Sequence, residues 1–164
     1  MGNLKLTSSA FSDGGEIPRE YGYKNGNREP QLTISGTPEG TKSLALIMDD
    51  PDAMGAVGKV WVHWVMWNID HDTLDIDGSL MTGRSYRLNM GIMEGMTDFG
   101  EVGYGGPAPP DKRHTYVFKL YALDDELDRL TGKDGNDDVT KADVEKAMEG
   151  HIVEQTQLTG TYAP

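Results

Sequence analysis

The chain has 164 residues, a length typical of one domain with its own hydrophobic core, and it contains no cysteine, which excludes disulfide bridges and thiolate metal sites. Its 27 acidic residues against 15 basic ones give a formal net charge of −12, which argues against a nucleic-acid partner and against adhesion to anionic membranes. No segment approaches the roughly 20 apolar residues that a membrane-spanning helix needs, and residues 1–10 lack a signal-peptide pattern. We therefore expect a single cytoplasmic domain over residues 1–164, without a membrane span.

The N-terminal quarter of the chain has few regular patterns. Residues 4–10 alternate weakly between apolar and polar side chains, which predicts an edge strand. Residues 13–40 are rich in Gly, Pro, Asn and Glu, so they predict a surface excursion. Within that excursion, residues 32–34 have the composition of a short strand.

Three later segments have the apolar patterns of buried strands. Residues 44–48 are all apolar and end abruptly at Asp49. Residues 61–69 are apolar at both odd and even positions, which predicts a central strand that is covered on both faces. Residues 116–123 carry apolar side chains at alternate positions, which predicts a third strand.

Two helices are expected in the last third of the chain. Asp124 is a suitable N-cap for a short helix that ends before Gly132. Thr140 and Asp143 have the spacing of a capping box, and a stripe at helical spacing runs from Val144 to Gln155. Residues 157–162 predict a closing strand. The elements together predict a mainly β domain with a few peripheral helices.

Ionisable side chains stand where the three buried strands begin or end. Asp50 and Asp52 directly follow the first strand, His63 lies inside the second, and His114 precedes the third, after a loop rich in glycine and proline at residues 105–110. If the strands are neighbours, these groups lie close together. Imidazolium rings and backbone N–H groups are suitable donors for a phosphate or carboxylate ligand, and the carboxylates would orient the rings. The pattern thus favours an anion site in which His63 and His114 act as donors.

Other interpretations of the same residues stay open at this point. His63 is also compatible with a core histidine satisfied by a neighbour, and the acidic pair at Asp50 and Asp52 with a plain turn. Two carboxylates and two imidazoles, Asp50, Asp52, His63 and His114, would suffice to hold zinc or iron and activate water, which would make the protein a metal-dependent hydrolase. The sequence has no metal-ligand spacing such as HExxH to support that alternative.

The sequence resembles the phosphatidylethanolamine-binding protein family in its bacterial and archaeal branch, whose members are similar to Raf kinase inhibitor protein. The motifs that carry the resemblance stand in family order: Asp50-Pro51-Asp52-Ala53, His63-Trp64 with Asn68, and Tyr104-Gly105-Gly106-Pro107-Ala108-Pro109-Pro110 followed by His114-Thr115-Tyr116. Two positions depart from the family pattern. Thr115 replaces an arginine and Met54 replaces a proline, which leaves open whether Arg113 supplies the missing cation.

The resemblance implies a β-sandwich in which a large sheet packs against a smaller one. It also implies a non-enzymatic binding module with an anion pocket for phosphate-bearing small molecules, including phospholipid headgroups. Carried over by motif, the ligand-binding residues are Asp50, Asp52, His63, Gly106, Pro109, His114 and Tyr116. No catalytic residue, cofactor or metal is implied. Some family members regulate kinases or proteases, so the resemblance further implies a kinase or protease partner. Other members form dimers, so it also implies a homodimer.

Overall fold

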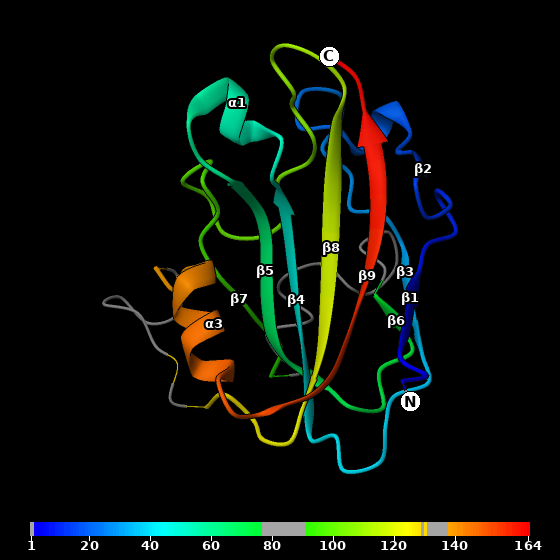
Figure 1. Ribbon diagram of the computed structural model, residues 1–164, viewed down its shortest axis with the longest axis vertical. Helices are drawn as coiled ribbons and strands as arrows, with labels where there is room; N and C mark the ends of the chain where they lie inside the picture. The colour runs from blue at the N-terminus through cyan, green and yellow to red at the C-terminus, as the bar shows by residue number, and fades with distance from the viewer. Residues whose placement is uncertain (1, 77–90, 129, 131–137) are drawn as a thin grey trace.

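The computed structural model describes residues 2–76, 91–128, 130 and 138–164. Its elements in chain order, labelled as in Figure 1, are β1 (Lys5–Thr7), β2 (Gly15–Glu16), the 3-10 helix η1 (Arg19–Tyr21), β3 (Leu32–Ser35), β4 (Ser43–Asp50), α1 (Ala53–Val57), β5 (Trp61–Asp70), β6 (Asp75–Ile76), β7 (Met93–Glu94), β8 (His114–Leu123), α3 (Lys141–Met148) and β9 (Ile152–Tyr162). A three-stranded sheet has the order β1-β3-β6, and a six-stranded sheet has the order β2-β9-β8-β4-β5-β7. The predicted mainly β sandwich is confirmed.

The large sheet is covered on both faces, which explains its two-sided apolar strands. Its inner face packs against the small sheet through a core cluster that includes Leu46, Trp64 and Phe118. Its outer face packs under α3 through a second cluster that includes Ile47 and Val144. Burying apolar area on both faces is the main force that stabilises such layers. Figure 1 shows α3 lying beside β5, and the prediction that residues 61–69 form a central strand is confirmed.

Two register shifts in β5 change which side chains share a face. Residues Trp64 and Val62 pair with successive residues of β4, so His63 is the extra residue of a β-bulge. A second shift lies near Asn68, whose φ of 54° is left-handed, and it moves Ile69 to the inner face together with Trp64. Strict alternation along residues 61–69 would place Ile69 on the face of Val65 and Val62 on the face of Trp64, and the two shifts exchange both. A bulge redirects side chains in this way because two residues on one strand face one on the other.

The C-terminal helix is shorter than the sequence pattern predicted. The predicted capping box is confirmed, because the Thr140 side chain accepts from the backbone N–H of Asp143 while the Asp143 carboxylate accepts from the Thr140 N–H. However, α3 ends at Met148, and Gly150 takes a φ of 81° that reverses the chain into β9. A left-handed glycine just beyond a helix is a common stop signal. The stripe expected to continue to Gln155 is instead the first half of a strand.

The other predicted helix is also corrected within the part of the chain that the structure describes. Residues 124–128 form bends and a turn, and the backbone N–H of Asp124 bonds to the carbonyl of His151. Residues 129 and 131 of that prediction lie outside the described residues. Within the described ranges, no helix is both long and apolar enough to cross a membrane.

The topology brings the polar ends of three strands to one end of the large sheet. Strand β4 runs antiparallel to both of its neighbours, with Asp50 opposite Trp61 and Asp49 opposite Val117. The last residues of β4 therefore lie beside the first residues of β5 and β8. Helix α1 and the loop before β8 lie at the same end, at the top of Figure 1. The candidate functional residues are carried by these segments.

Candidate functional site

A cavity of about 220 Å³ lies at this end of the large sheet. Its wall is largely apolar: α1 contributes Ala53, Ala56 and Val57, while Trp61 and Phe99 contribute aromatic rings. The polar members of the wall are Asp50, His63, His114 and Tyr116, all four of which were predicted as site residues. A few convergent polar groups in an apolar cavity are typical of small-molecule sites.

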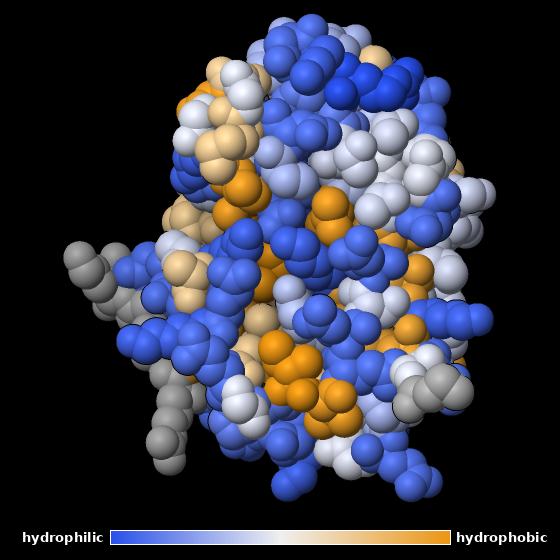
Figure 2. Space-filling view, in the orientation of Figure 1, coloured by the Kyte–Doolittle hydropathy of each residue, from blue (hydrophilic) through white to orange (hydrophobic). Residues whose placement is uncertain are grey.

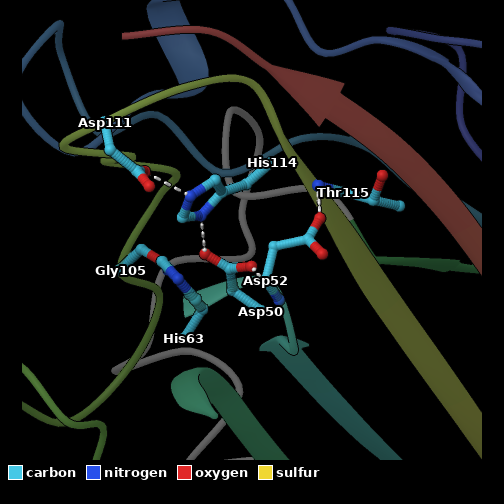
Figure 3. A network of polar contacts seen from close by, with 7 residues as sticks. All are labelled: Asp50, Asp52, His63, Gly105, Asp111, His114 and Thr115. Carbon is cyan, nitrogen blue, oxygen red and sulfur yellow. Dashed lines mark hydrogen bonds and ion pairs between the residues drawn. The ribbon is translucent and has the colours of Figure 1, made fainter. Parts of the chain in front are cut away.

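His114 forms the centre of a polar network that Figure 3 shows from close by. Its side chain is fully buried, with 0 % exposed. The ring Nδ1 lies 2.6 Å from Asp50 Oδ2, and the ring Nε2 lies 2.7 Å from Asp111 Oδ1. An ionised carboxylate can only accept a hydrogen bond, so both ring nitrogens must donate. The geometry therefore favours a charged imidazolium ring.

Burial is the largest single influence on the pKa of His114, and it acts against the charged ring. The hydrogen bonds to Asp50 and Asp111, together with their charges, outweigh burial and raise the pKa above its ordinary value. Both N–H groups are thereby engaged within the protein. The predicted direct donation from His114 to a ligand would therefore require the ligand to displace one of the two carboxylates. His114 instead contributes a positive charge to the cavity wall.

The two carboxylates of the first motif have different positions. Asp50 is almost fully buried in the cavity wall, and its Oδ1 accepts the backbone N–H of Asp52 at 3.0 Å. The Asp52 side chain is exposed, and its Oδ2 accepts the backbone N–H of Thr115 at 2.8 Å. Asp52 thus fastens the turn after β4 to the start of β8, and it is not among the residues that line the cavity.

His63 contributes an uncharged ring to the cavity. Its Nδ1 lies 2.7 Å from the carbonyl oxygen of Gly105, so this nitrogen carries the proton and donates. Burial lowers the pKa of His63, although the Gly105 carbonyl and the charge of Asp50 act in the opposite direction. The remaining nitrogen, Nε2, is therefore an acceptor at neutral pH and becomes a donor when the ring is protonated.

Two further residues of the cavity wall carry buried polar atoms without a hydrogen-bond partner. These atoms are the hydroxyl of Tyr116 and the indole nitrogen of Trp61. Burial, followed by the charge of Asp50, raises the pKa of Tyr116 well above its ordinary value, so the hydroxyl keeps its proton. The Ala108 backbone and the Asp50 carboxylate lie near this hydroxyl, but neither is in hydrogen-bond geometry with it. Leaving such a donor unsatisfied costs about 1–3 kcal/mol. Unpaired buried groups of this kind often indicate where a ligand or water binds.

The glycine and proline of the second motif lie outside the cavity wall. The backbone N–H of Gly106 donates to Asn27 Oδ1 at 2.7 Å, and a Cβ at Gly106 would lie 2.0 Å from the carbonyl oxygen of Tyr21. Glycine is needed there because two backbones approach closely. Pro109 is buried and borders a separate depression of about 380 Å³ beside Arg19. Both residues shape the loop that carries Ala108 into the wall of the cavity.

The departures from the family pattern leave the cavity without an arginine or lysine in its wall, as far as the structure describes it. Arg113 does not replace the missing cation, since its guanidinium contacts Glu16 at 3.2 Å and Thr161 at 3.1 Å. Met54 projects from α1 with 54 % of its surface exposed.

Among the site residues that were not predicted from the sequence, three contribute an aromatic ring or a charge: Trp61, Phe99 and Asp111. Trp61 precedes His63 by two residues, a spacing that places both on one face of a regular strand, and this signal was available. Phe99 packs edge-on against His63 with ring centroids 5.3 Å apart, but it comes from a distant loop. Asp111 lies in the loop before β8, where an acidic residue ordinarily indicates only a turn. No local pattern distinguishes the last two residues.

The arrangement gives no support to the metal-site alternative. Within the described ranges, the one group of three ligand-type side chains whose donor atoms lie within 4.8 Å of one another is exposed, at Asp70, His71 and Asp72. That group follows the far end of β5, away from the cavity. In the cavity itself, both nitrogens of His114 already contact carboxylates.

Comparisons with known proteins agree over nearly the whole chain. Residues 7–163 match the family model described as phosphatidylethanolamine-binding protein. A UPF0098 protein of Methanothermobacter thermautotrophicus is 42% identical over 159 residues, covering 97% of this chain and 98% of that protein. A crystal structure of a phosphatidylethanolamine-binding protein homolog from Chlamydia trachomatis superposes with a TM-score of 0.82 at 34% identity, covering 99% of this chain and 98% of that one. Escherichia coli YbcL, described as a member of the mammalian family, gives a TM-score of 0.80 at 29% identity, covering 98% of both chains.

Proposed function

The chain belongs to the phosphatidylethanolamine-binding protein family, and from this premise we propose that its cavity binds the phosphate group of a small molecule or lipid headgroup without performing chemistry on it. The observation that carries the proposal is the pair of buried donors, the Tyr116 hydroxyl and the Trp61 indole N–H, that lack partners in the cavity wall. Phosphate oxygens are strong acceptors, so a phosphate that reached these donors would satisfy both.

The size of the cavity supports a small ligand group. Its volume of about 220 Å³ is below the roughly 300–1,000 Å³ of sites that enclose drug-sized ligands. A phosphate with a short substituent fits this space, whereas an acyl chain does not. If the ligand is a lipid, the headgroup enters the cavity and the remainder stays outside.

The cavity wall also supports binding without catalysis. Among the described residues that line the cavity, none is a serine, threonine, cysteine or lysine that could act as a nucleophile. The ring of His114 is held between two carboxylates, and the Nδ1–H of His63 is held by a carbonyl group. General base catalysis would therefore depend on the Nε2 atom of His63. The phenol of Tyr116 is the one hydroxyl among the described residues of the wall that this base could activate.

Charge balance sets a condition on anion binding. The positive charge of His114 is matched by Asp50, so the anion needs a further positive group. His63 can supply it by taking up a proton on Nε2, because a bound anion favours the charged ring. Burial holds the pKa of the free ring below its ordinary value, so proton uptake must accompany binding at neutral pH.

We therefore expect the affinity for a phosphodiester to rise as the pH falls, by at most about tenfold per pH unit for one coupled proton. Glycerophosphoethanolamine is a suitable probe, since its phosphodiester does not titrate near neutral pH. Calorimetric titration in two buffers with different ionisation enthalpies would count the protons taken up. The His63→Gln variant keeps a polar side chain but cannot become charged, so its affinity should be weaker and independent of pH. An equal pH dependence in both proteins would contradict this role of His63.

A further inference from the structure

Asp111 is a carboxylate beside the cavity to which the proposed function gives no part in choosing the ligand. Its side chain is 43% exposed, whereas the His114 ring that it contacts is fully buried. The preceding residue, Pro110, lines the cavity, so Asp111 stands next to the wall. It holds the ring through Nε2, on the side opposite the buried Asp50.

The charges of this network leave a negative balance beside the cavity. Asp50 and Asp111 together carry two negative charges, and the His114 ring carries one positive charge. The Arg113 guanidinium is engaged by Glu16, and the exposed Lys112, unlike Asp111, does not contact the His114 ring. Asp50 alone would neutralise the ring, so Asp111 supplies excess negative charge at the ring, and the charge of the exposed Asp52, which also acts on Tyr116, adds to it.

We infer that Asp111 determines the charge selectivity of the cavity: by holding the second N–H of His114 it adds a negative charge that disfavours dianionic phosphate monoesters and favours phosphodiesters, which carry a single negative charge. The inference rests on the proposed function. It narrows the ligand class from phosphate groups in general to phosphodiester-type groups.

The effect follows from Coulomb's law. Repulsion between Asp111 and a ligand grows in proportion to the ligand's charge, so the energy for a dianion is about twice that for a monoanion. Removing the charge of Asp111 should therefore raise the affinity for both ligands, and the fold-increase for a dianion should be about the square of the fold-increase for a monoanion. In a well-hydrated setting these factors are roughly three and ten.

The test compares Asp111→Asn with a matched charge control. Asparagine keeps an oxygen that can accept the Nε2–H of His114 but removes the charge. The control is Glu39→Gln, an exposed residue in the loop before β4, at the opposite end of that strand from Asp50. Methyl phosphate and dimethyl phosphate serve as probes at about pH 7, where the second ionisation of a phosphate monoester, with a pKa of about 6, is largely complete. Binding is followed by NMR chemical shifts of cavity residues.

We expect Asp111→Asn to bind methyl phosphate roughly tenfold more tightly and dimethyl phosphate roughly threefold more tightly than the unaltered protein. The Glu39→Gln control should leave both affinities unchanged. Equal gains for the two probes, or gains no larger than those of the control, would overturn the role of Asp111 while the proposed function stands. If neither probe shifts the cavity resonances in any of the three proteins, the proposed function and this inference both fail.

Discussion

Replacing Asp50 with alanine is expected to lower the free energy of unfolding by about 3–5 kcal/mol, the loss typical of breaking a buried ion pair by removing one partner. The change leaves the fully buried His114 ring with only the half-exposed Asp111 as a partner. It also removes the acceptor of the Asp52 N–H at the end of β4. Denaturant unfolding at neutral pH, analysed for both the midpoint and the slope, measures the loss.

The pH dependence of this loss identifies its cause. The pKa of His114 is raised in the folded state, so the stability that the charged ring contributes is fully present below its unfolded pKa of about 6.5. This contribution disappears as the pH rises through the raised folded pKa. The destabilisation by Asp50→Ala should therefore be largest just below pH 6.5 and decrease as the pH rises through the raised pKa of the folded-state ring. Asp52→Ala, which removes one exposed hydrogen bond, should cost only about 0.5–1.5 kcal/mol, and a loss for Asp50→Ala no larger than this would contradict the account.

The largest effect on binding is expected from filling the cavity. Ala56 lies on α1 in the cavity wall, and its replacement by phenylalanine places an aromatic ring against the apolar lining. Burying the ring there is favourable, since apolar area contributes about 25 cal/mol per Å². The ring would occupy much of the 220 Å³ that the ligand needs, so we expect affinity for glycerophosphoethanolamine to fall by more than about a hundredfold.

The matched control for this change lies two residues earlier on the same helix. Met54 is 54% exposed and is not among the cavity-lining residues, so Met54→Phe should leave binding unchanged. Calorimetric titration of both variants, with denaturant unfolding to confirm that each is folded, makes the comparison. Undiminished binding in Ala56→Phe would place the ligand site elsewhere on the molecule.

The sequence was sufficient to predict the architecture because buried strands carry apolar residues in recognisable patterns. The segments at 44–48, 61–69 and 116–123 are buried on one or both faces, and all three are adjacent strands of the large sheet. Asp50, His63, His114 and Tyr116 could be placed at one site because antiparallel neighbours bring strand ends together.

The features that the sequence could not predict depend on contacts between distant segments or on the conformation of one residue, and neither produces a pattern in the sequence. The bulge that makes His63 an extra residue in β5 follows from the pairing of two strands, not from any residue in it. The bond between Asp111 and His114 changes the role of the ring, yet Asp111 has the composition of an ordinary turn. The left-handed conformation of Gly150 turns the chain out of α3, whereas the apolar spacing alone indicated a helix that continued to Gln155.

A crystal structure determined in the presence of glycerophosphoethanolamine would test the central proposal most directly. The account predicts the phosphate group inside the cavity, with its oxygens within hydrogen-bonding distance of the Tyr116 hydroxyl, the Trp61 indole N–H and Nε2 of His63. It further predicts that Asp50 and Asp111 keep their contacts with His114, because the ring acts through its charge. A phosphate bound outside the cavity, or one that takes the place of Asp111 on the His114 ring, would contradict the account.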